Sequence, residues 1–161
     1  MNPKYTVMLD RSVGRFVYPL HRRLYTLTGG AIGHRSGLGP VLLLTVTGRK
    51  SGLPRVTPLL YMPDGDAFVV VGSNGGRPDP PQWLLNLEAN PEATVQAGRQ
   101  RAAVRAEILG GAEAEAMWPR LDHHYPGWRY YQSLTDREIT PVRLVRAESA
   151  PSGRADRDRP G

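Results

Sequence analysis

The chain has 161 residues, a formal net charge of +6 and no cysteine. This length suits a single domain with a sizeable core, and the lack of cysteine excludes disulfides, iron–sulfur clusters, thiolate zinc sites and a cysteine nucleophile. The basic residues are spread along the chain and are nearly all arginine, so composition alone does not choose among a nucleic acid, an anionic lipid surface and a small phosphorylated ligand.

The first part of the chain, residues 1–37, predicts an amphipathic basic helix followed by a glycine-rich linker. Apolar side chains recur at helical spacing over residues 13–27, arginines lie mostly on the other face, and Pro19 is expected to kink the helix. Two interpretations stay open: the apolar face packs on the domain, or it makes a peripheral contact with an anionic membrane. The sequence carries no signal-peptide pattern and no run of about 20 apolar residues, so we expect a cytoplasmic protein, with the inner face of the plasma membrane as the alternative.

Residues 38–147 predict one domain made mainly of short strands. Apolar and β-branched runs at residues 41–47, 55–62 and 67–72 predict three strands, and the Pro-Asp-Gly-Asp turn at 63–66 joins the last two as a hairpin. The pattern then predicts a helix, a second hairpin, another helix and a final strand, at residues 82–89, 93–109, 112–124 and 141–145. Six strands paired as hairpins favour a small antiparallel barrel with peripheral helices, of the α+β or mainly β class. Residues 148–161 have little to bury and are expected to be disordered.

The turn between the first two strands reads Gly48-Arg49-Lys50-Ser51-Gly52 and holds one of only two lysines in the chain. Two glycines allow a tight turn that exposes backbone N–H groups, and the three side chains between them add charge and donors. Arg55 opens the next strand and can add a bidentate donor. These residues suit a phosphate or carboxylate ligand, and the alternative is an ordinary solvated hairpin turn.

Three further features have both a binding and a structural interpretation. The Ser73-Asn74-Gly75-Gly76 loop is either a ligand contact or a turn that needs positive φ at its glycines. Trp83 is either a core anchor or the flat wall of a ring-shaped pocket. Tyr125, Trp128 and Tyr131 recur every three residues and predict an aromatic shelf on one helical face, which either covers a ligand or joins the core.

The sequence offers no evident catalytic pair. No carboxylate stands at metal-ligand spacing from the histidines, so we expect no metal site, and Ser133, Thr135 and Asp136 have no paired base for a hydrolytic triad. If the chain is an enzyme, a cofactor is therefore expected to carry the chemistry.

Four motifs follow one another in the chain: TGRKSGLPRVTPLLY, VVVGSNGG, PQWLLNLEANP and YPGWRYYQSLTDREITPV, at residues 47–61, 69–76, 81–91 and 125–142. Together they closely resemble the deazaflavin-dependent nitroreductases, oxidoreductases with a split, FMN-binding-like β-barrel that use the reduced 8-hydroxy-5-deazaflavin coenzyme F420. The resemblance covers residues 38–145. It implies a six-stranded split barrel and hydride transfer from F420 to a flat electrophile such as a quinone, nitroaromatic or enone.

The resemblance also implies roles for individual residues. The coenzyme's phosphate and acidic tail would be held by Gly48, Arg49, Lys50, Ser51, Gly52, Arg55 and Pro58. The deazaflavin would lie against Val71, Gly72, Ser73, Asn74 and Gly75, beside Trp83 and Asn86. The acceptor would lie against Leu60, Tyr125, Trp128 and Tyr131. The implied catalytic residues are Ser73, Tyr125 and Tyr131, with Ser73, Tyr125 or solvent supplying a proton.

Three positions depart from the family pattern. Leu60 stands where a pocket-facing tyrosine is usual, with Tyr61 expected to point to the opposite face of the strand. Leu84 and Trp128 also replace tyrosines that are common in the family. These departures bear on nitroaromatic reduction more than on coenzyme binding.

Other readings of the same residues stay open. One is a split-barrel oxidoreductase that uses FMN, and another is a protein that binds the coenzyme without catalysis. A nucleic-acid-binding barrel would use the net positive charge and stack bases on the aromatic shelf. The basic residues form no long patch interleaved with aromatics, so we expect no nucleic-acid partner. Monomer and homodimer are both compatible with the sequence.

Overall fold

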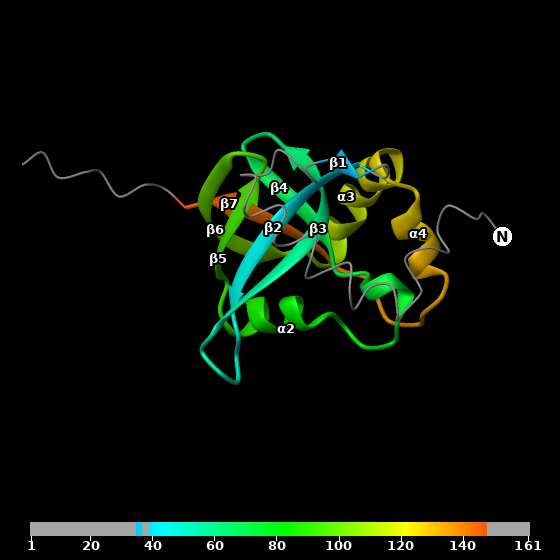
Figure 1. Cartoon of the computed structure of the whole chain (residues 1–161). Coiled ribbons are helices and arrows are strands. Elements are labelled where there is room, and N and C mark those ends of the chain that lie inside the picture. Colours follow the sequence, from blue (N-terminus) through cyan, green and yellow to red (C-terminus); the bar gives the residue numbers. More distant parts are fainter. Residues whose placement is uncertain (1–34, 37–38, 148–161) are drawn as a thin grey trace, which may run out of the picture.

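The computed structural model describes residues 35–36 and 39–147 (Figure 1). The predicted N-terminal helix with its membrane contact, most of the linker and the predicted disordered tail lie outside the described residues. Within the described ranges, no helix has the length and apolar character needed to cross a bilayer.

The strands and helices predicted within residues 38–147 are confirmed to within two residues at each end. The strands are β1 (Arg35–Ser36), β2 (Gly39–Thr47), β3 (Pro54–Asp64), β4 (Ala67–Val71), β5 (Glu92–Ala97), β6 (Gln100–Ile108) and β7 (Pro141–Arg146). The helical elements are the 3₁₀ turn η2 (Asn74–Gly76), α2 (Gln82–Ala89), α3 (Gly111–His124) and α4 (Gly127–Gln132). The sequence did not predict β1, because two residues are too few to show a strand periodicity.

Six strands close into an antiparallel barrel, as predicted. The order is β2-β3-β4-β7-β6-β5, and β5 pairs in turn with β2. The long strand β2 makes this closure: Leu44 lies opposite Thr57 of β3 on one side and Val95 of β5 on the other. Every strand of the barrel therefore has two neighbours, so none presents a free edge.

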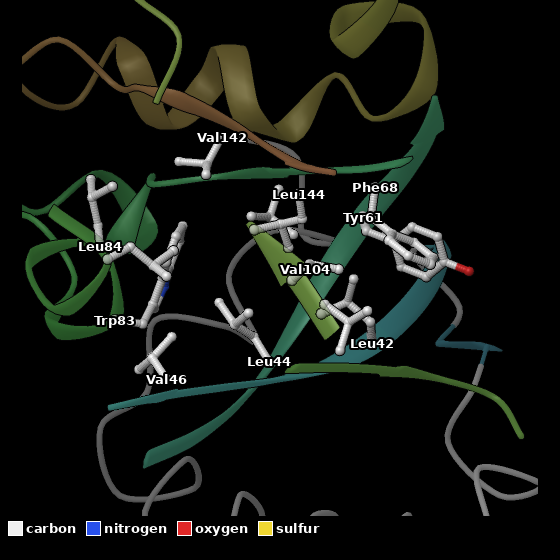
Figure 2. Packing of buried hydrophobic residues seen from close by; sticks show 13 residues of the cluster. Leu42, Leu44, Val46, Tyr61, Phe68, Trp83, Leu84, Val104, Val142 and Leu144 are labelled. Atoms are coloured by element: carbon white, nitrogen blue, oxygen red, sulfur yellow. The ribbon is translucent and has the colours of Figure 1, made fainter. Parts of the chain in front are cut away.

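The barrel core is filled by alternate residues of the strands and closed at one end by α2. Leu42, Leu44 and Val46 of β2 point inward toward the opposite strands (Figure 2). Trp83 of α2 lies at the end near Val46 (Figure 2), which is the end from which the β2–β3 turn extends. Helix α2 therefore plugs the barrel beside that turn.

An outer core lies between the barrel wall and the helices α3 and α4. Met62, Val69 and Val71 point outward from β3 and β4 and pack against buried side chains of the two helices. Leu60 packs on this outer core whereas Tyr61 belongs to the barrel core, so the two point to opposite faces of β3 as expected. The barrel wall thus has apolar packing on both faces where α3 and α4 cover it (Figure 1).

Candidate functional site

The turn at residues 48–52, here named the cationic turn, uses most of its backbone donors internally. The N–H of Gly48 donates to Leu53 O at 2.8 Å, and the N–H groups of Ser51 and Gly52 donate to Gly48 O at 3.2 and 2.7 Å. The Ser51 hydroxyl accepts the N–H of Leu53. Hydrogen bonds across the turn therefore engage three of the N–H groups that were predicted to be exposed, those of Gly48, Ser51 and Gly52.

Both glycines of the cationic turn are required by its geometry. A Cβ at position 48 would lie 2.9 Å from the Ser51 hydroxyl oxygen and 3.1 Å from Leu53 O. Gly52 has φ +67°, in the left-handed region that other residues rarely adopt. The close turn brings Arg55 near, and its Nη2 donates to the Ser51 hydroxyl at 3.3 Å.

Arg49 ties the cationic turn to α2. Its backbone N–H and its Nη1 both donate to Asn86 Oδ1, at 3.1 and 2.9 Å, and its Nη2 donates to Gln82 Oε1 at 3.0 Å. Asn86 is only 5% exposed, and such a buried amide is costly to leave unpaired. The structure therefore brings the predicted site residues Arg49 and Asn86 together, but they bind each other.

Lys50 is the cation of the turn that stays unengaged. It is exposed, and across residues 35–36 and 39–147 its ammonium group makes no hydrogen bond or ion pair. Arg55 is exposed as well, with one bond to Ser51. Pro58 lies further along β3, opposite Leu43 of β2. Lys50 and Arg55 can therefore meet an anion without breaking an internal ion pair.

The loop at residues 73–76, here named the glycine loop, has three successive residues in the left-handed region. Asn74, Gly75 and Gly76 have φ of 46°, 64° and 76°. The Asn74 side chain donates to Asp79 O at 2.8 Å, and Gly76 N–H donates to Ser73 O at 2.9 Å. Asparagine and glycine tolerate this conformation better than other residues, which explains the SNGG pattern.

Within the described part of the chain, several donors of the glycine loop have no partner. They are the Ser73 hydroxyl and the N–H groups of Asn74 and Gly75. Ser73 and both following residues are half-buried, so these donors lie near the surface. This loop therefore offers two adjacent unpaired backbone N–H groups and a hydroxyl to a ligand.

Helix α2 connects the two segments. Gly72, just before the glycine loop, packs so closely on α2 that a Cβ there would lie 2.9 Å from Leu84 Cδ2. Two residues further along the helix, on a different face, Asn86 holds Arg49. The sequence left open whether the turn and the loop lie at the same part of the barrel, and α2 is the element that contacts both.

Arg137 is a residue of the site that sequence reasoning missed. Its Nη2 donates to the carbonyl oxygens of Gly72, Ser73 and Arg77 at 3.1, 3.2 and 3.4 Å. Burial lowers the pKa of its guanidinium, and the nearby Asp79 carboxylate opposes this shift. No local sequence pattern predicts these hydrogen bonds, because the carbonyl groups lie 60 to 65 residues earlier in the chain.

The aromatic shelf exists and belongs to the outer core. Tyr125, Trp128 and Tyr131 are 5%, 3% and 2% exposed. The rings of Tyr125 and Trp128 meet edge to face at 5.3 Å, and His124 stacks on Trp128 at 6.2 Å. Leu60 packs on the same core. The predicted acceptor residues are thus gathered in one place, but their contact with an acceptor stays a prediction.

Trp83 also lies inside, in the barrel core, so the structure favours the core-anchor interpretation of this residue. Its place beside the coenzyme stays a prediction. Among residues 35–36 and 39–147, no three side chains of His, Asp or Glu gather closely enough to hold a metal ion.

Comparison with known proteins bears on the coenzyme. Residues 17–146 match the family model described as F420H(2)-dependent quinone reductase. An F420H(2)-dependent quinone reductase of Mycobacterium tuberculosis is 41% identical over 143 residues, which cover 86% of this chain and 95% of the relative.

Two solved structures are similar to this chain. One, described as an F420-H2 dependent reductase, has a TM-score of 0.60 and 37% identity, and the match covers 65% of this chain and 93% of that chain. Another, described as a domain-swapped dimer, has a TM-score of 0.63 and 33% identity, with 78% and 96% covered. The resemblance read from the four motifs is confirmed, with F420 rather than FMN as the coenzyme, and the chain belongs to the F420H(2)-dependent quinone reductase family of split-barrel oxidoreductases.

Proposed function

We propose that this protein reduces a quinone with F420H2, and that the coenzyme lies between the cationic turn and the glycine loop, along α2. The observation that carries this placement is the contrast between donors that are used and donors that are free. Lys50 and the N–H groups of Asn74 and Gly75 are unengaged among the described residues, whereas Arg49 and Arg137 are bound to protein oxygens.

The residues present fit the coenzyme. A phosphate and an acidic tail need cations that are free to approach, and Lys50 with Arg55 provides them. A planar ring with polar edges needs hydrogen-bond donors on a backbone that comes close, and the glycine loop provides these without bulky side chains. When bound, the reduced deazaflavin supplies the hydride.

The chain itself has to supply alignment and a proton. A quinone that accepts a hydride also takes up one proton to become a hydroquinone. The Ser73 hydroxyl is half-buried and unpaired in the described part of the chain, so it can pass a proton from solvent to an acceptor oxygen. Tyr125 and Tyr131 are the alternative donors, and with Trp128 they form the apolar side of the site.

A quinone is the preferred acceptor for two reasons. The family is described by that substrate, and Leu60 offers no hydroxyl to orient a nitro group where the resemblance implies a tyrosine. Nitroaromatics and enones are flat electrophiles of the same kind, and we propose them as poorer acceptors. Monomer and homodimer both stay open; the domain-swapped dimer is a property of the solved relative.

The binding site can be tested by titrating the protein with F420. We expect Lys50→Ala and Arg55→Ala each to weaken binding about tenfold to a hundredfold, which corresponds to roughly 1.5–3 kcal/mol for a lost charge-assisted contact. The melting temperature should stay unchanged for Lys50→Ala, because its ammonium group is unengaged in the described structure.

The matched control is Arg99→Ala, which removes an exposed cation from the β5–β6 turn. It should leave the affinity for F420 unchanged. Wild-type affinity in both the Lys50 and Arg55 variants would overturn the placement of the coenzyme. Oxidation of F420H2 by menadione, followed by absorbance near ~420 nm, then tests the reaction itself.

Contact with an anionic membrane through residues 13–27 is a separate proposal that rests on the sequence alone. A membrane quinone would be reached most directly from such a position. We expect the full-length protein to sediment with anionic vesicles and a variant without residues 1–28 to stay in the supernatant. Equal recovery of the two would contradict the proposal.

A further inference from the structure

Arg137 has the position of a residue that shapes the coenzyme site without touching the chemistry. We propose that Arg137 is a positioning residue: by binding Ser73 O and the flanking carbonyl groups of Gly72 and Arg77, it turns the unpaired N–H of Asn74 toward the coenzyme. This inference rests on the proposed function. It is carried by the contacts of one side chain, by peptide geometry and by the backbone conformation of the loop.

Arg137 donates hydrogen bonds to carbonyl groups in and beside the glycine loop. Its Nη2 lies 3.1 Å from Gly72 O and 3.2 Å from Ser73 O, and reaches Arg77 O at 3.4 Å. Its Nη1 donates to Glu138 O at 3.3 Å. All these acceptors are backbone carbonyl groups, so the guanidinium fixes the direction of peptide planes rather than the position of a side chain.

The geometry of the peptide bond means that a hydrogen bond to Ser73 O also sets the direction of the N–H of Asn74. In a trans peptide the carbonyl and the following N–H point in opposite directions, and no described peptide bond is cis. Because Ser73 O points toward Arg137, the N–H of Asn74 points away from it. That N–H has no partner among the described residues. Arg137 thereby presents a free backbone donor on the side of the loop opposite to itself.

The conformation of the loop needs such support. Asn74 has φ 46°, a left-handed value that non-glycine residues hold only where the surroundings enforce it. At the end of the loop, Gly76 is packed so tightly that a Cβ would lie 2.8 Å from Tyr131 O. The loop is therefore held at two points, by α4 at Gly76 and by the guanidinium of Arg137 at Ser73 O.

Arg137 is itself held by α4, the helix that carries Trp128 and Tyr131. Gln132 Nε2 donates to Arg137 O at 2.8 Å, and Gln132 Oε1 accepts the N–H of Ile139 at 2.8 Å. The N–H of Arg137 donates to Thr135 Oγ1 at 3.2 Å. One amide side chain thus links the helix of the aromatic shelf to the residue that orients the glycine loop.

The test uses Arg137→Lys, which keeps the charge but loses the forked guanidinium, and Arg137→Met, which loses both. We expect the dissociation constant for F420 and the KM for F420H2 to rise roughly tenfold or more in both variants. At saturating coenzyme, the KM for menadione should stay at the wild-type value. If Arg137 were needed only for folding, its replacement would lower the melting temperature without raising the KM for F420H2 relative to the KM for menadione.

Arg143→Lys is the matched control. Arg143 is a half-buried arginine of β7 that pairs with Asp64 and Glu107, remote from the glycine loop in its contacts. It should lose stability and keep the affinity for F420. Arg137→Ala with added methylguanidinium should recover part of the binding, whereas the same additive should not change binding by Arg143→Lys.

Wild-type affinity for F420 in Arg137→Lys and Arg137→Met would overturn the proposal. If neither variant folds, Gln132→Met tests the same link by releasing the backbone of Arg137, and unchanged affinity there would overturn it as well. Failure of the wild-type protein to bind F420 would contradict the proposed function instead, so the two failures are distinguishable.

Discussion

Neighbouring residues of the same charge have different tasks in the cationic turn. The guanidinium of Arg49 is directed toward α2 and donates to the amide oxygens of Asn86 and Gln82. The ammonium of Lys50 is exposed and free of partners in the described part of the chain. A planar fork suits two fixed acceptors, and a compact point charge suits a mobile anion. Arg49 and Lys50 therefore cannot exchange positions without losing these contacts.

Gly127 is a second position where a single atom decides the local structure. A Cβ there would lie within 2.5 Å of the Tyr125 hydroxyl oxygen, so Gly127→Ala must displace the first ring of the aromatic shelf. We expect it to destabilise the fold by about 1–3 kcal/mol, as overpacking of a core does. Urea unfolding measures this loss.

The control is Gly110→Ala, at a glycine where nothing lies within 4 Å of an added Cβ and where φ is −136°. Its change should stay below about 1 kcal/mol, since the weaker capping by alanine offsets the gain from a less flexible unfolded chain. Equal losses in the two variants would show that the contact with Tyr125 is not the cause.

One carboxylate, that of Asp64, links the hairpin of β3 and β4 to α3 and β7 through ion pairs. Asp64 binds Arg120 of α3 at 2.9 Å and Arg143 of β7 at 3.0 Å. The hydrogen bond from Arg120 is the main reason that the pKa of Asp64 lies below its ordinary value; burial raises this pKa, and Arg143 lowers it again. The ionised carboxylate therefore stabilises the hairpin and α3 against each other.

This pairing predicts a dependence of stability on pH. Because the pKa of Asp64 is lower in the folded protein, its contribution is complete above the unfolded value of about 4 and disappears as the pH falls through the folded value. Asp64→Asn should lose about 1 kcal/mol at pH 7, a modest figure because Arg120 is half exposed. Below the folded pKa of Asp64, the variant and the wild type should have nearly equal free energies of unfolding.

Asp66→Asn serves as the comparison, since Asp66 is exposed on the same hairpin and its carboxylate makes no ion pair among the described residues. It should be neutral at both pH values. A constant difference between Asp64→Asn and the wild type across the pH range would contradict the role of the ionised carboxylate.

The barrel as a whole was predictable where its contacts are local. Helix α2 begins after Pro81 and ends before Asn90-Pro91, and these residues mark its bounds in the sequence. The hairpins follow from tight turns such as residues 98–99 between β5 and β6. The closing pair of β2 with β5 joins strands about 50 residues apart, so it could be inferred only from the class of fold.

The parts of the site that escaped prediction depend on distant contacts. Whether Trp83 was a core anchor or a pocket wall could not be decided locally, because its environment is the barrel interior formed by other strands. Arg137 was missed because an arginine in a loop looks the same whether it is solvated or bound to carbonyl groups 65 residues away. The N–H groups of Gly48, Ser51 and Gly52 were expected to be free, and only the folded turn shows that they bond to carbonyl groups of Gly48 and Leu53.

Because lysine is rare in this chain, Lys50 is also a site for selective chemical modification. The chain has two lysines, Lys4 and Lys50, so only these side chains and the terminal amine react with amine-directed reagents. Lys50 is exposed and unpaired in the described structure, which favours its modification at mildly alkaline pH. A sensor surface coupled through amines would therefore block the very cation assigned to the coenzyme tail. Conversely, protection of Lys50 from acetylation by added F420 would read out occupancy of the turn in a crude lysate.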